Sequence, residues 1–213
     1  MDRSSQIDEF RGLFQVSRET FKSLEKYEEL VIAGNKKLNL IGNSTINLIW
    51  NRHITDSYQV IDLIDENDKT LIDIGTGAGF PGIVLALAAK EMKIPLKVAL
   101  IEKSPKKMKF LENALDKLNL TVKVICKNIL DGENIVANVF VARAFKPLEE
   151  ILKLIHNKTF NYEKFFIFQG KTGNIELLQA AKSWDIEYKQ RVSVTSNDSK
   201  ILEIKNLTKK NIV

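Results

Sequence analysis

Residues 70–82 read TLIDIGTGAGFPG, an apolar run that reaches an aspartate and continues into a glycine-rich turn. The apolar stretch 82–92 follows directly, so the segment predicts a strand, a tight loop and a helix in that order. The four glycines between positions 75 and 82 permit positive φ angles and a close approach of the backbone to a ligand. Because the first N–H groups of a helix lack intrahelical partners, the segment predicts a ligand site at this turn.

Short apolar runs alternate with helical stretches through the rest of the chain. The first five runs are rich in Val, Ile and Phe and lack in/out alternation, as expected for strands covered on both faces. This order predicts a Rossmann-like α/β fold, a mostly parallel seven-stranded sheet with helices on both faces. The last two runs flank the turn cluster SNDS and predict an antiparallel pair that closes the sheet. The expected strands are 70–75, 96–102, 122–126, 138–143, 164–169, 186–194 and 200–205, and the expected helices are 82–92, 105–118, 147–157 and 173–182.

The N-terminal part, residues 1–66, has a purely helical pattern. Ser5 and Asp8 suit the start of a first helix, and Gly34 and Asn35 suit the end of a second. We therefore divide the chain into an N-terminal helical cap, 1–66, and a Rossmann-like domain, 67–213. The helical spacing is carried by Ile7, Phe10, Leu13 and Phe14, and then by Phe21, Leu24, Tyr27 and Val31.

Composition excludes several classes of protein. The 213 residues are 44% hydrophobic and 28% charged, which is typical of a globular domain. A single cysteine, Cys126, excludes an internal disulfide and a multi-cysteine zinc site, and it fits a reducing compartment. The charged N-terminus lacks the apolar core of a signal peptide, and the uncharged stretch 74–89 is too short to span a membrane. We expect a cytoplasmic monomer without a metal or a membrane contact.

Two classes of cofactor suit the glycine turn. Read as G-x-G-x-x-G over 77–82, with Glu102 20 residues further on, it suits a nicotinamide dinucleotide and an oxidoreductase. Read as D-x-G-x-G-x-G over 73–79, it resembles the first motif of class I S-adenosylmethionine methyltransferases. Asp73 favours the second reading, since a carboxylate repels a pyrophosphate and attracts an ammonium and a sulfonium. A methyltransferase acting on a small molecule and a non-catalytic RNA-binding module remain alternatives on the same fold.

Further motifs surround this turn in a fixed order: NL at 39–40, RHITDS at 52–57, FPG at 80–82 and VARAF at 141–145. Together they resemble the bacterial 16S ribosomal RNA guanine-N7 methyltransferase family, also called glucose-inhibited division protein B. The resemblance covers about residues 39–205. It implies that S-adenosylmethionine is the cofactor and that 16S rRNA of the small ribosomal subunit is the substrate.

The resemblance also implies site residues. It assigns cofactor binding to the glycine turn and to Ile129 and Leu130, which follow shortly after the third strand. It also identifies Arg143 as the arginine of the RAF motif. The stretch KNIL at 127–130 lacks the acidic residue common there, so the backbone must make that contact. The FQG at 168–170 replaces the family's LKG, so an RNA-contacting lysine is either Lys171 or absent. The expected cofactor-binding residues are Asp73, Gly75, Gly77, Phe80, Glu102, Ile129, Leu130 and Arg143.

The chemistry implied for guanine N7 requires no catalytic side chain. N7 carries a lone pair and no proton, so no general base is needed, and orientation can supply ~7–11 kcal/mol. The chain has no Asn/Asp-Pro-Pro-aromatic tetrad and no Pro-Cys pair, and Cys126 is expected to be core filler. His53 has two candidate roles: it shapes the substrate pocket, or it forms a structural hydrogen bond with Asp56, three residues further on, which is the role we favour.

Lysines crowd the expected start of the helix at 105–118. Cations are unfavourable at a helix N-terminus, so an RNA phosphate is a candidate partner for them. The net charge of +5 is consistent with an anionic partner. The lysines concerned are Lys103, Lys106, Lys107 and Lys109, with weaker support from Lys36, Lys37, Lys209 and Lys210.

Overall fold

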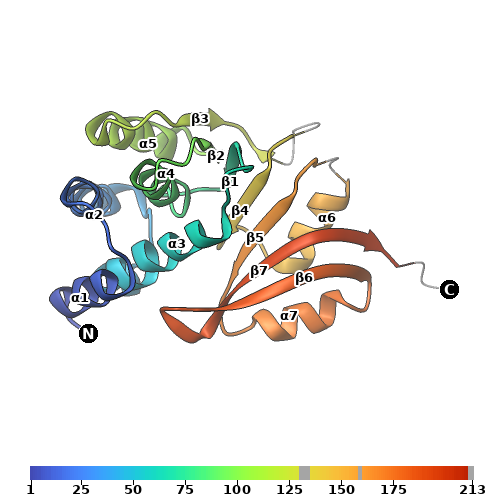
Figure 1. Ribbon diagram of the computed structural model, residues 1–213. Coiled ribbons are helices and arrows are strands. Elements are labelled where there is room, and N and C mark those ends of the chain that lie inside the picture. Colours follow the sequence, from blue (N-terminus) through green and yellow to red (C-terminus); the bar gives the residue numbers. More distant parts are fainter. Residues whose placement is uncertain (130–134, 158–159, 211–213) are drawn as a thin grey trace.

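The computed structural model describes residues 1–129, 135–157 and 160–210. Its centre is a seven-stranded sheet with the order β3-β2-β1-β4-β5-β7-β6 (Figure 1). The first five strands are parallel, whereas β7 is antiparallel to both β5 and β6, so the predicted Rossmann-like sheet and its closing pair are confirmed. The strands are β1 (Thr70–Ile74), β2 (Lys97–Glu102), β3 (Lys123–Cys126), β4 (Val139–Arg143), β5 (Lys164–Gln169), β6 (Trp184–Ser193) and β7 (Ser196–Lys209).

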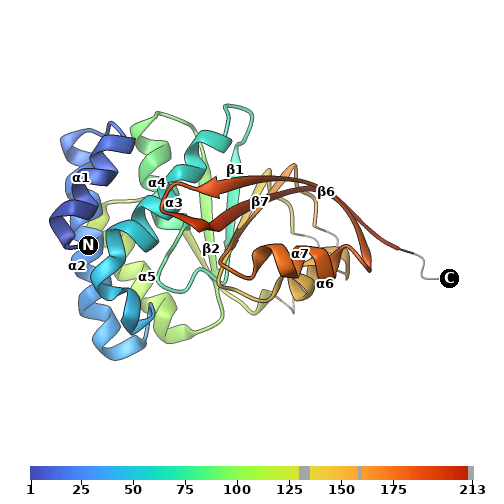
Figure 2. The ribbon, with the colours of Figure 1, turned by 90° about the horizontal axis from the view of Figure 1, so that it is seen from below.

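Helices cover both faces of the sheet, as predicted. Figure 2 shows α4 and α5 on one side and α6 and α7 on the other. Neighbouring residues of one strand point into different layers: Leu100 belongs to the hydrophobic cluster that includes α4 and α5, and Ile101 to the cluster that includes α6 and α7. The helices are α4 (Gly82–Glu91), α5 (Pro105–Leu118), α6 (Leu148–Asn157) and α7 (Gly173–Ala180). No helix among the described residues is long and apolar enough to cross a lipid bilayer.

The N-terminal segment packs against the face that carries α4 and α5. Its buried Glu28 accepts hydrogen bonds from Trp50 Nε1 at 2.8 Å and from Arg3 Nη2 at 2.7 Å. Its apolar residues belong to the same hydrophobic cluster as residues of β1, β2 and α4, so the N-terminal segment and this face of the sheet are packed as one hydrophobic cluster. The elements are α1 (Arg3–Leu13), α2 (Arg18–Leu38), η1 (Asn43–Leu48), the π-helical η2 (Trp50–Thr55), α3 (Asp56–Tyr58) and η3 (Gln59–Leu63).

The ends of the first two helices differ from the prediction. Asp2, not Ser5, caps α1 by accepting a hydrogen bond from the Ser5 backbone N–H. Helix α2 continues through Gly34 and Asn35, which both make contacts with the chain that follows the helix. A Cβ at position 34 would lie 2.8 Å from Leu40 Cδ1, and the Asn35 side chain accepts a hydrogen bond from the Ile41 N–H. These residues serve tertiary packing, so their stop signals were misleading.

Two further expectations were wrong. The cluster SNDS at 196–199 belongs to β7, and the connection between β6 and β7 lies at residues 194–195. Cys126 is exposed, because it ends β3 and β3 is an edge strand of the sheet. Core filling therefore does not explain this cysteine.

Gly82 at the start of α4 is a sensitive point of the packing. A Cβ there would lie 2.3 Å from Leu100 Cδ2 and 2.8 Å from Asp73 Oδ2. We expect Gly82→Ala to lower the free energy of unfolding by about 1–3 kcal/mol, the usual cost of overpacking, as measured by urea denaturation. Gly170 is the matched control, because a Cβ there would meet nothing within 4 Å. Equal stability of Gly82→Ala and Gly170→Ala would contradict this account.

Candidate cofactor site

A cavity opens where β1, β2 and β4 end, beside the point at which the strand order reverses. In open α/β sheets ligands bind in this crevice at the carboxyl ends of the strands. The cavity has a volume of about 370 Å³, within the ~300–1,000 Å³ usual for small-molecule sites. Six of the eight predicted cofactor residues line it: Gly75, Gly77, Phe80, Glu102, Ile129 and Arg143.

Asp73 lies beneath the glycine turn and is not part of the cavity wall. Its Oδ2 accepts hydrogen bonds from Thr76 Oγ1 at 2.6 Å and from the Gly82 N–H at 2.8 Å. Its Oδ1 is buried and has no hydrogen-bond partner among the described residues. Because burial disfavours the charged form, the pKa of Asp73 rises to about 6. The residue thus shapes the loop from below, and its predicted interaction with the cofactor stays a prediction.

The backbone of the glycine turn is held from both sides. Gly75 has φ +65° and donates its N–H to Ile101 O at 2.9 Å. A Cβ at this position would lie 2.3 Å from a ring carbon of Phe145, so only glycine fits. On the other side, the buried Tyr27 hydroxyl of α2 donates to Ala78 O at 2.9 Å. The N-terminal segment therefore helps to shape the cavity.

Glu102 ends β2 with its carboxylate on the cavity wall. Its Oε2 accepts the Gly77 N–H at 3.0 Å and its Oε1 accepts the Ser104 N–H at 2.8 Å. Each carboxylate oxygen has a second lone pair, so the group retains acceptor capacity for hydroxyls of a ligand. This is the position at which the sequence predicted a ribose contact.

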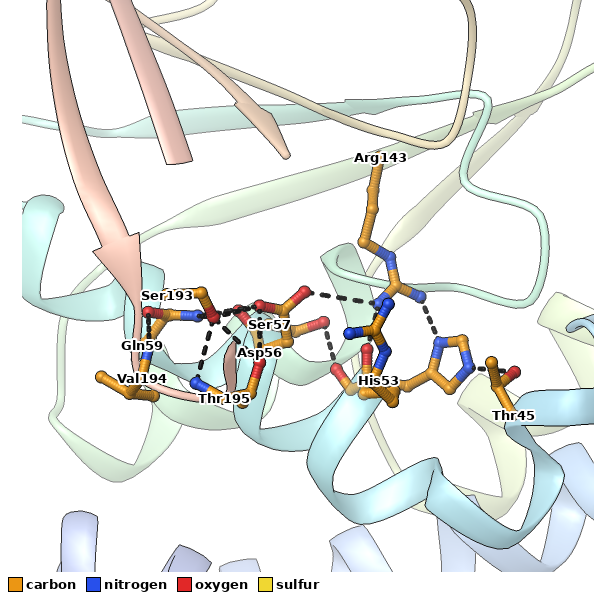
Figure 3. Close-up of polar contacts among 10 residues, drawn as sticks. Thr45, His53, Asp56, Ser57, Gln59, Arg143, Ser193, Val194 and Thr195 are labelled. Atoms are coloured by element: carbon orange, nitrogen blue, oxygen red, sulfur yellow. Dashed lines mark hydrogen bonds and ion pairs between the residues drawn. The ribbon is translucent and has the colours of Figure 1, made fainter. Parts of the chain in front are cut away.

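Arg143 ends β4, and its guanidinium has three partners from the segment 52–56 (Figure 3). Nη2 is 2.7 Å from His53 Nδ1, and Nη1 lies 3.0 Å from Arg52 O and 4.0 Å from Asp56 Oδ2. Burial lowers the pKa of His53 to about 2, and the positive charges of Arg143 and Arg52 contribute to this shift. The neutral ring therefore accepts from Arg143 at Nδ1 and donates from Nε2 to Thr45 Oγ1 at 2.8 Å.

The expected direct bond between His53 and Asp56 is wrong, because each side chain contacts Arg143 independently. Sequence reasoning also missed Phe145 and the segment 40–42 as cavity walls, although both lie in or next to motifs that carried the resemblance. Leu130 lies outside the described residues. Within the described part of the chain, no group of three or more His, Cys, Asp or Glu side chains is placed to hold a metal ion.

Solved structures share this fold. A SAM-dependent methyltransferase from Aquifex aeolicus has a TM-score of 0.55 and 15% identity, covering 80% of this chain and 97% of that chain. The 16S rRNA methylase RmtB has a TM-score of 0.52 and 13% identity, covering 90% of this chain and 76% of that chain. At such identities the likeness concerns the fold alone. The fold is that of the class I S-adenosylmethionine methyltransferases, as the glycine turn predicted.

Sequence relatives are more specific. The family model described as rRNA small subunit methyltransferase G (GidB) matches residues 20–207. The protein named ribosomal RNA small subunit methyltransferase G from Pelagibacter ubique (strain HTCC1062) is 37% identical over 198 residues, 92% of this chain and 93% of the relative. The Rickettsia felis protein of the same name is 39% identical over 197 residues, 92% of this chain and 99% of the relative. The chain belongs to this methyltransferase family.

The buried charge of Asp73 predicts a pH dependence of stability. Because the pKa in the folded state, about 6, exceeds the ordinary value of 3.8, the stability contributed by this carboxyl is full below pH 3.8 and is lost as the pH rises through 6. Relative to Asp73→Asn, the wild type should lose up to about 3 kcal/mol between pH 4 and pH 7, measured by urea denaturation.

Thr76→Val provides a second measurement. It removes a hydrogen bond that favours the charged carboxylate, so it should extend the loss of stability to higher pH. Parallel stability curves for the wild type and Asp73→Asn would contradict the buried charge.

Proposed function

We propose that this protein transfers the methyl group of S-adenosylmethionine to N7 of a guanine in 16S ribosomal RNA of the small subunit. The observation that carries the proposal is the cavity walled by the glycine turn and Glu102, in a chain of the rRNA small subunit methyltransferase G family. The name of the relatives supports small-subunit rRNA as the substrate. The choice of N7 rests on the resemblance carried by RHITDS and RAF.

The residues around the cavity fit this cofactor. Glu102 would hold the ribose hydroxyls, Ile129 and Leu130 would lie beside the adenine, and Arg143 would stand near the transferring group. The unpartnered Oδ1 of Asp73 beneath the turn adds negative charge that favours a cationic ligand. When bound, S-adenosylmethionine supplies a methyl group on a cationic sulfur. The nicotinamide and small-molecule alternatives are set aside, because the family match covers most of the chain.

For the transfer itself, the protein has to orient N7 relative to the methyl group. The N7 lone pair forms the new N–C bond while the electrons of the C–S bond return to sulfur, so the positive charge moves to the base. No proton leaves N7 in this step. The nearby His53 is neutral and its Nδ1 already accepts from Arg143, so it is not a free base. Holding N7 in line with the methyl group therefore accounts for the chemistry required of the chain.

The lysines at the start of α5 support an RNA partner. Lys103 and Lys107 line the cavity, and Lys106 and Lys109 are exposed on α5. Within residues 1–129, 135–157 and 160–210, none of the four forms an ion pair. By contrast, the exposed Lys171 pairs with Asp198 at 3.5 Å, and Lys210 pairs with Asp185 at 3.4 Å. We further propose that the protein acts as a monomer in the cytoplasm, where its ribosomal substrate is found.

Loss of the protein should remove one N7-methylguanine from 16S rRNA, detected by chemical cleavage at methylated guanines. The wild-type gene should restore it. A gene carrying Glu102→Ala should not restore the methylation, since Glu102 is the only acidic residue among the described residues that line the cavity. Glu112→Ala is the matched control, because Glu112 is exposed on α5 and does not line the cavity. A methylation pattern unchanged by loss of the protein would overturn the proposed function.

Phosphate contacts by the four lysines should make RNA binding sensitive to salt. With four contacts, a plot of the logarithm of the binding constant against the logarithm of the salt concentration should have a slope of about −3. Lys106→Gln should make this slope shallower by about 0.7. Lys123→Gln, at the opposite end of the strands, should leave it unchanged. A wild-type slope near zero would exclude these contacts.

A further inference from the structure

A second cavity of about 270 Å³ lies on the other side of Arg143. It shares Arg143, His53 and Ala144 with the cavity at the ends of β1, β2 and β4, in which we propose that the cofactor binds and which we call the cofactor cavity. A ligand in the second cavity would therefore lie next to a group held in the first. The volume is below that of the cofactor cavity and slightly below the range usual for small-molecule sites, which suits a single base.

Asp56 lines this second cavity, and its two carboxylate oxygens have different partners. Its Oδ1 accepts from Gln59 Nε2 at 3.0 Å and from Ser193 Oγ at 2.8 Å (Figure 3). Its Oδ2 forms an ion pair with Arg143 Nη1 at 4.0 Å and accepts no hydrogen bond from the described residues. The side chain is 15% exposed and lines the second cavity but not the first. Hydrogen bonds thus hold the carboxylate by Oδ1, whereas Oδ2 retains acceptor capacity.

We propose that the second cavity binds the acceptor guanine and that Asp56 Oδ2 reads its N1–H and 2-amino groups. This inference rests on the proposed function. Guanine carries donors at N1 and N2 on one edge and the acceptors O6 and N7 on another. Arg143, on the shared wall, donates to O6, which turns N7 toward the cofactor cavity and the donor edge toward Asp56. Adenine would place its 6-amino donor against the guanidinium and its N1 acceptor against the carboxylate, so the pair selects guanine.

The same arrangement assists the transfer. As positive charge arrives on the purine, N1–H becomes a stronger donor, so its bond to Asp56 strengthens in the transition state. The carboxylate also offsets the charge of Arg143, which stands beside the ring that becomes cationic. Asp56 therefore contributes to turnover as well as to selection of the base.

The position of the cavity also restricts the RNA. In an A-form duplex N7 faces a deep and narrow groove that side chains do not reach. A base that enters a cavity walled by Asp56 and Arg143 must be unpaired or turned out of its stack. The half-buried Phe168 ring on the cavity wall offers an apolar surface for such a base.

Methylation of an RNA fragment containing the mapped guanine, or inosine at that position, tests the role of Asp56. Inosine keeps O6, N7 and N1–H but lacks the 2-amino group. For the wild type, kcat/KM should fall roughly tenfold or more with inosine, the size of loss expected for a missing base-edge contact. Asp56→Asn keeps an acceptor toward Ser193 and places an amide donor in the cavity. It should lower kcat for guanine and reduce the guanine-to-inosine ratio to about one.

Ser193→Ala is the matched control, because it removes a partner of Oδ1 and leaves Oδ2 in place. It should lower thermal stability while keeping the guanine-to-inosine ratio of the wild type. Binding of S-adenosylhomocysteine to Asp56→Asn, measured by calorimetry, should equal that of the wild type. Equal rates on guanine and inosine, or a ratio unchanged in Asp56→Asn, would overturn this inference alone. A wild-type protein that methylates no guanine would instead overturn the proposed function.

Discussion

The hydrogen bonds of the Asp73 carboxylate, to Thr76 and to the first N–H of α4, are the constraint on which the site depends. A buried carboxylate is costly unless donors surround it, and these two donors come from the turn itself and from the start of the helix. The two hydrogen bonds to Oδ2 therefore bend the chain after β1 in one way. That bend places the glycine backbone against Glu102 and opens the cavity beside it.

A second polar centre, around Arg143, joins parts of the chain that are far apart in sequence. The end of β4, the segment 52–56 and the end of β6 meet there through His53, Asp56 and Ser193. The helical N-terminal segment is therefore part of the functional unit, since it supplies side chains to both cavities as well as covering the sheet. One hydrophobic cluster likewise includes residues from both parts of the chain.

Much of the fold was predictable because it depends on local patterns. Apolar runs without alternation indicated the buried parallel strands, and the observed strands β1 to β5 differ from the predicted ranges by at most one residue at each end. Predictions failed where distant residues decide the outcome. Gly34 and Asn35 continue a helix because the chain at 40–41 packs against them, and Cys126 is exposed because β3 has a neighbour on one side only.

Sequence patterns indicated the order of strands and helices along the chain, the glycine turn at the end of β1 and six of the residues that line the cavity beside this turn. These features follow from neighbours along the chain, and from motifs that keep their spacing. Local patterns did not indicate that Asp73 lies under the turn, that His53 contacts Arg143, or that Asp56 accepts a hydrogen bond from Ser193, since these contacts depend on tertiary packing. The physical reason is distance: the bond from Ser193 to Asp56 joins residues 137 positions apart, and no local pattern encodes which buried polar groups will meet.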